Sequence, residues 1–149
     1  MLEFYNVEKK VVIVAIIWAI ISQIIPEIFD IYHMQSISLI GTFLVFPIGI
    51  LINIAIGYFT TKEIVLTQKK QFSNALVSGY TTGMIFGAMY GFTVILLEIF
   101  FVLARNNFSN YLNLIFYYLT SGIFVIVFIV FFSSIFAAIG GLIYSFLKK

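Results

Sequence analysis

Four long apolar stretches, separated by short polar connectors, constrain this sequence more than any other feature. The chain has 149 residues, of which 62% are hydrophobic and only 9% are charged. A water-soluble domain has about a quarter of its residues charged, so a soluble fold is excluded. A helix that crosses a bilayer needs about 20 mostly apolar residues. The expected fold is therefore all-α, a single-domain integral membrane bundle of four transmembrane helices with spans at about 7–25, 37–59, 75–104 and 119–147.

Two prolines and one aromatic-rich segment bear on these boundaries. Pro26 is expected to end or kink the first helix, and Pro47 to kink the second, because proline has no amide hydrogen to donate. Residues 108–118 combine two asparagines with aromatic side chains, which is typical of a segment at the lipid headgroups. The membrane crossing of the last helix is therefore expected to begin near Leu119. The start of the chain looks like the front of a signal peptide, but no small-residue cleavage motif follows, which predicts a retained first helix.

The basic residues fall almost entirely on one side of a four-span arrangement. Seven of the eight lie at the same ends of the predicted spans, and only Arg105 lies at the other. Lys and Arg favour the cytosolic side, so both termini are expected in the cytosol and the protein in the cell membrane, as a multi-pass protein. The net charge of +2 does not indicate a nucleic-acid partner. The expected partners are the lipid bilayer and other membrane protein subunits or further copies of the chain.

Small residues recur at every fourth position along the third span. This glycine zipper consists of Gly79, Gly83, Gly87 and Gly91. Related small residues in the second and fourth spans are Gly49, Gly57, Ala137 and Gly141. Lipid is as apolar as leucine, so transmembrane helices associate through close backbone contacts that glycine permits. These residues predict packing of spans two, three and four within one chain, with span one more peripheral. Self-association through the third span is an additional hypothesis.

Three polar residues are candidates for a polar path between helices. Glu98 lies seven residues after Gly91 and seven before Arg105, which places all three on one helix face. A carboxylate inside hydrocarbon is unfavourable unless it faces protein or water. Glu98 therefore either pairs with Arg105 or headgroup water, or lies on an ion or proton path. Asn53, in the second span, is expected to hydrogen-bond across a helix interface.

Metal, redox and enzyme chemistry find little support in the sequence. Glu27, Asp30 and His33 recur every third residue, but a metal site usually needs three or four supported ligands, and His33 is the only histidine. The chain has no cysteine, which removes disulfides and thiolate sites. No nucleophile, base and orienting group form a recognisable catalytic set, and no phosphate-binding loop is present. We therefore predict no enzyme activity, no metal and no cofactor.

Near its end the chain combines small residues with a pair of lysines, in the order Ala137, Ala138, Ile139, Gly140, Gly141, Lys148 and Lys149. Together with the short charged connectors and the glycine-striped third span, this layout resembles small four-span archaeal membrane proteins of uncharacterised function. The resemblance implies no activity and no residue roles. Extensive packing surface without catalytic residues predicts a small structural or accessory subunit of a membrane complex. The alternative is an ion or small-solute channel or transporter that acts as an oligomer, because so few polar groups form a poor conduit alone.

Overall fold

The protein is entirely helical over the residues that its computed structural model describes, which are 2–31, 35–65, 71–105 and 111–147. The four helices are α1 (Leu2–Ile31), α2 (Gln35–Val65), α3 (Gln71–Arg105) and α4 (Tyr111–Leu147). Each contains a stretch long and apolar enough to cross a membrane, and these candidate spans are Lys9–Pro26, Leu44–Glu63, Ser73–Phe101 and Leu119–Leu147. The prediction of an all-α chain with four apolar helices is confirmed, as expected for a multi-pass membrane protein.

The helices extend beyond the predicted spans at both ends, except that α4 ends at Leu147, as predicted. Pro26 and Pro47 both lie inside helices, so the alternative that Pro26 ends the first helix is wrong. Residues 111–118 continue α4 without a break and form no separate segment, while residues 108–110 lie outside the described chain. Continuous helix satisfies the backbone hydrogen bonds within each segment, which apolar surroundings require.

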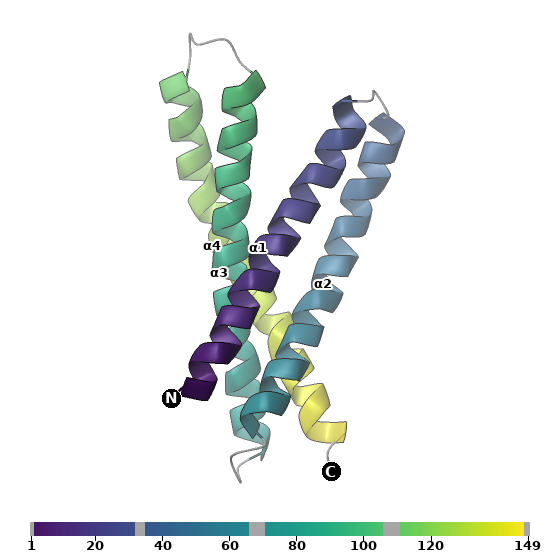
Figure 1. Ribbon diagram of the computed structural model, residues 1–149, viewed down its shortest axis with the longest axis vertical. Coiled ribbons are helices and arrows are strands. Elements are labelled where there is room, and N and C mark those ends of the chain that lie inside the picture. Colours follow the sequence, from purple (N-terminus) through teal and green to yellow (C-terminus); the bar gives the residue numbers. More distant parts are fainter. Residues whose placement is uncertain (1, 32–34, 66–70, 106–110, 148–149) are drawn as a thin grey trace.

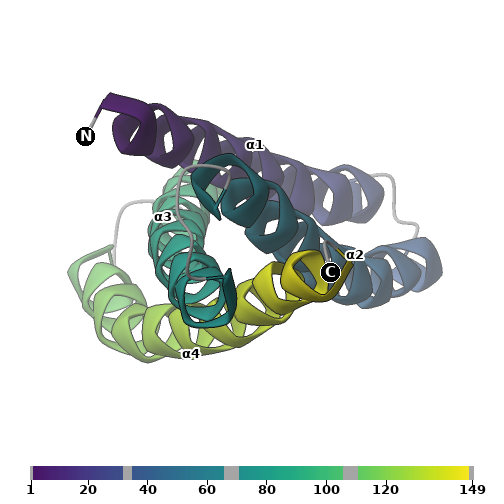
Figure 2. The same ribbon diagram turned by 90° about the horizontal axis from the view of Figure 1, so that it is seen from below.

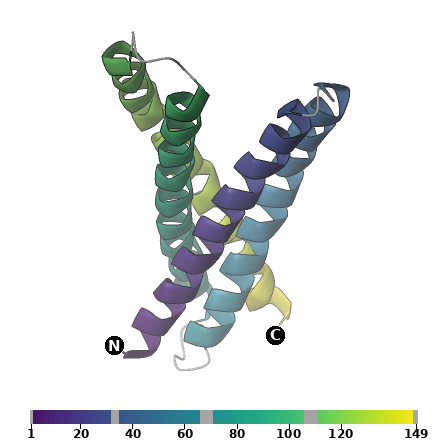
Figure 3. The same cartoon turned by 45° about the horizontal axis from the view of Figure 1, so that its top comes forward.

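The helices form two antiparallel hairpins, α1 with α2 and α3 with α4, arranged as a V (Figure 1). The hairpins are closest at the end where α1 begins and α4 ends, and they diverge toward the other end (Figure 3). In the view from below, α4 runs alongside α3, and the last part of α4 lies next to α2 (Figure 2). The start of α1 and the end of α4 therefore lie at the same end of the molecule, as an even number of crossings requires.

The first helix contacts the rest of the bundle less than the other three helices do, as predicted, but it also contributes to the apolar core. Val11 and Ala15 of α1 are buried with Phe86 of α3, and partly buried side chains from α2 and α3 pack around them. Within the described residues α1 contacts α2 and α3 but not α4. The small residues Ala15 and Ala19 lie four positions apart and are fully buried, so the α1 backbone can approach its neighbours closely.

The four glycines Gly79, Gly83, Gly87 and Gly91 of the third span all pack against α4. A methyl group added at Gly79 would lie 2.5 Å from the carbonyl oxygen of Ala137, and one at Gly87 would lie 2.7 Å from the Cα of Val130. Gly83 faces the backbone of Ser133 and Ser134 in the same way, and Gly91 faces Ile126. Each step of four residues along α3 is matched by a step of four back along α4. We call this line of backbone contacts the α3–α4 seam.

A second line of close contacts joins the last part of α4 to α2 and α3. Gly57 of α2 lies directly against the backbone of Ala137, and Gly140 lies against the carbonyl of Ile54. On the neighbouring face of α4, Gly141 meets the carbonyl of Ala75, which also accepts a long 3.5 Å hydrogen bond from the Thr61 hydroxyl. The end of α4 is therefore wedged between α2 and α3. Gly49 lies outside this region and faces the Trp18 indole nitrogen at ordinary contact distance, 3.5 Å.

Substitution within the α3–α4 seam should destabilise the bundle. Gly83→Leu places a side chain where the α4 backbone lies, and overpacking of this kind costs about 1–3 kcal/mol or more. Ala88→Leu is the matched control, because Ala88 lies on the exposed face of the same helix. We expect a clear loss of thermal stability in detergent for Gly83→Leu and little change for Ala88→Leu. Equal thermal midpoints for the two variants would show that the seam does not limit stability.

Candidate functional site

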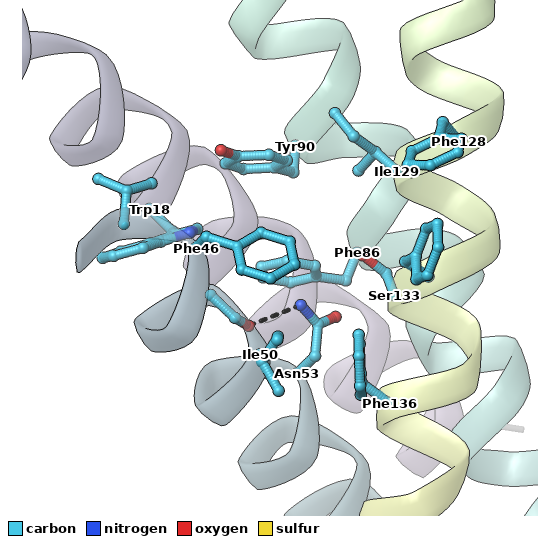
Figure 4. A pocket seen from close by; sticks show the side chains of 13 residues that line it. Trp18, Phe46, Ile50, Asn53, Phe86, Tyr90, Phe128, Ile129, Ser133 and Phe136 are labelled. Atoms are coloured by element: carbon cyan, nitrogen blue, oxygen red, sulfur yellow. Dashed lines mark hydrogen bonds between the residues drawn. The ribbon is translucent and has the colours of Figure 1, made fainter. Parts of the chain in front are cut away.

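A pocket of about 240 Å³ lies where the two hairpins begin to diverge, and all four helices line it (Figure 4). Most of its wall is aromatic, and the rings come from Trp18, Phe46, Phe86, Tyr90, Phe128, Phe132 and Phe136. Phe46 of α2 and Phe128 of α4 are 68% and 66% exposed, whereas Phe86 is buried at the opposite wall. The pocket is therefore an aromatic recess that opens sideways from the bundle.

The pocket lies at the level of the centres of the four helices. The midpoints of α2 and α4 fall at Ile50 and Ile129, which both line the pocket. Trp18 and Phe86, which also line it, lie within two residues of the midpoints of α1 and α3. In a bilayer crossed by these four helices, the recess would lie near the midplane and open toward the acyl chains.

Asn53 contributes a side-chain amide to the pocket, and only 7% of its surface is exposed. Its side-chain nitrogen donates a 2.8 Å hydrogen bond to the carbonyl oxygen of Gly49, one turn earlier on the same helix. Its side-chain oxygen Oδ1 has no hydrogen-bond partner in the described chain. In Figure 4 this oxygen points from α2 toward α4, on the side of Ser133 and Phe136. The bond that Asn53 makes lies within its own helix and not across a helix interface, contrary to expectation.

One polar contact does cross a helix interface near the pocket. The hydroxyl oxygens of Ser22 on α1 and Tyr90 on α3 lie 3.2 Å apart. Ser22 donates its single proton to the carbonyl of Ala19, 3.0 Å away, so Tyr90 is the donor in the contact between helices. No sequence pattern marks this pair, because a serine and a tyrosine in separate spans form no recognisable motif.

The other candidate polar residues do not join this site. Glu98 is half-buried on α3, eleven residues beyond Gly87, which is about 16 Å along the helix axis. It has an interaction partner and does not line the pocket that contains Asn53. Arg105 is the last residue of α3, and its side chain lies outside the described part of the structure. Asn53 and Glu98 therefore lie at different depths, and of the two only Asn53 lines this pocket.

Charged and metal-binding candidates are equally separate from the pocket. Lys10 of α1 and Glu63 of α2 form an exposed 3.1 Å ion pair at the end where α1 begins. The side chains of Glu27, Asp30 and His33 lie outside the described residues, and the described residues contain no group of three or more His, Asp or Glu side chains placed to bind a metal. The pocket wall, in contrast, contains no charged residue among those described.

Comparison of the sequence with models of protein families, with curated proteins and with solved structures finds no match. The resemblance to small four-span archaeal membrane proteins therefore stays a prediction. Any function of the protein has to be inferred from the arrangement of its own side chains.

Loss of the Tyr90 hydroxyl should weaken the contact between α1 and α3. Hydrogen bonds between transmembrane helices contribute about 0.6 kcal/mol on average, so Tyr90→Phe should cause a small but measurable loss of stability in detergent. Tyr80→Phe is the matched control, because Tyr80 lies on the same helix with 45% of its surface exposed. If the two variants unfold at the same temperature, the contact between Ser22 and Tyr90 does not stabilise the bundle.

Proposed function

We propose that the protein is a small structural subunit of a membrane assembly, and that its diverging hairpins hold a transmembrane segment of a partner between them. The observation that carries this proposal is the uneven distribution of buried residues along the spans. On α3 the buried positions end at Gly91, although the candidate span continues to Phe101. On α2 no described side chain from Leu44 to Ile52 is buried. Over these residues both helices therefore bury less of their surface within the chain than they do over their other described residues.

A partner segment would supply contacts that the chain itself lacks over these residues. Transmembrane helices gain stability from close van der Waals packing and polar contacts, which lipid tails provide less well. Glu98 lies in this same part of α3, and carboxylates inside a bilayer usually face protein or water. A partner between the hairpins would cover this region of α3 and contact the exposed face of α2.

The zipper of the third span, by contrast, is occupied within the chain. All four of its glycines contact α4, so a second copy could use them only by displacing that helix. Self-association through this stripe would thus require the bundle to open. The surfaces that remain available for a partner are the exposed aliphatic and aromatic side chains between the hairpins, of which Phe46 is the most exposed on α2.

The test is extraction from the native membrane in a mild detergent, followed by mass measurement of the intact particle. We expect a hetero-complex of fixed stoichiometry. Phe46→Ala should reduce its yield several-fold, because Phe46 lies at the diverging half of α2. Phe59→Ala is the matched control, since Phe59 is 59% exposed on the same helix but lies in the closely packed half. Recovery of the chain only as a monomer or homo-oligomer would contradict the proposal, as would equal yields for the two variants.

A further inference from the structure

We propose that the pocket at the divergence of the hairpins binds a small neutral ring compound that has one hydrogen-bond donor, a phenol-type molecule dissolved in the bilayer. This inference goes beyond the subunit role and does not depend on it. It rests on three features of the pocket, which are the unpaired acceptor on Asn53, the aromatic walls and the depth of the site.

The unpaired oxygen of Asn53 defines which polar group the ligand offers. Oδ1 is an acceptor only, and the assignment of the amide is fixed because Nδ2 donates to Gly49. A buried acceptor without a partner has already lost its hydrogen bonds to water in the empty protein. A ligand that donates to it therefore gains a hydrogen bond without a new desolvation cost for this acceptor. No described charged residue lines the pocket, so a charged ligand would have no counter-ion there. The ligand is therefore neutral and donates a hydrogen bond.

The walls of the pocket define the body of the ligand. Phe86 and Tyr90 present parallel rings, with centroids 6.0 Å apart and an interplanar angle of 6°, and the rings of Phe128 and Phe132 stand on the α4 side. Aromatic rings pack favourably against other rings in stacked and edge-on arrangements. An apolar cavity of about 150 Å³ holds one benzene molecule, so about 240 Å³ holds one ring with a few further atoms. A phospholipid or a multi-ring lipid exceeds this volume.

The depth of the pocket separates this ligand from an ordinary membrane lipid. Lipid headgroups lie about 15 Å from the centre of the hydrocarbon layer, and a lipid at the midplane offers only methylene groups. An acyl chain can occupy the recess but leaves the Asn53 oxygen unpaired. A small phenol dissolves in the hydrocarbon as a whole molecule, so its hydroxyl can reach this depth. It can enter the pocket sideways between Phe46 and Phe128, which are both largely exposed. Oδ1 has almost no accessible surface, so the side chains next to it have to move before a ligand can contact it.

Trp18 allows a direct test, because it is the one tryptophan of the chain and it lines the pocket. The full chain is reconstituted in phosphatidylcholine vesicles and titrated with 4-bromophenol or with 4-bromoanisole. Bromine quenches tryptophan fluorescence on contact, and the two compounds share a ring and differ in the hydroxyl donor. We expect saturable quenching by 4-bromophenol, with an affinity about fivefold higher than that of 4-bromoanisole, the ratio expected for one buried hydrogen bond.

Asn53→Leu should abolish the preference for the phenol, because leucine is similar in size and offers no acceptor. Ser78→Ala is the matched control, since the buried Ser78 hydroxyl also lacks a partner in the described chain but does not line the pocket. It should keep the full preference. Linear, non-saturating quenching by both compounds would overturn the proposal, because it shows only dissolution in lipid. Equal saturable affinities on the unmodified chain would overturn it too, and this comparison needs no variant to fold.

Discussion

The α3–α4 seam is the contact on which the rest of the structure depends. Lipid offers no hydrophobic driving force for helix association, so two helices stay together only where their backbones approach closely or polar groups bond. At Gly79, Gly83, Gly87 and Gly91 the α3 backbone presents no side chain to α4, which follows it in antiparallel register. The same spacing of four residues on both helices keeps the contact continuous over several turns. Within the described residues, no other pair of helices is in contact over so large an area of its surface as α3 and α4.

The hairpins diverge because α4 contacts α3 over several turns but contacts α2 closely only near its own last turns. Ala137, at the end of the seam, and Gly140, one turn further along α4, also contact α2 closely, so α2 is held near that end. From Leu44 to Ile52 no described side chain of α2 is buried, and Phe46 lines the pocket together with Phe128 of α4. The pocket forms at the point where close backbone contact stops. One or two turns away from the glycine contacts, aromatic side chains line the space between the helices.

The sequence predicts the helices and their packing faces better than it predicts the site. Apolar runs are long enough to define four spans, and the spacing of glycines identifies a face for close contact at Gly83 and Gly87. Periodicity assigns a face to one helix, but it does not identify the helix opposite, so whether the stripe served α4 or a second copy stayed open. Asn53 stands out in the sequence because it is a polar residue within an apolar span. Its bond to Gly49 and its unpaired oxygen depend on side-chain rotation, which no residue pattern encodes.

A polar side chain at the centre of a span is unfavourable in free energy, and helix packing alone does not explain why Asn53 is present there. If Asn53 served only to join helices, its oxygen would meet a donor on α1, α3 or α4, as Tyr90 meets Ser22. Instead its nitrogen returns to its own helix and its oxygen points toward α4 beside an open recess. A leucine at this position would fill similar space without the cost of an unpaired acceptor. The arrangement is therefore better suited to a molecule that enters the recess than to the packing of the bundle itself.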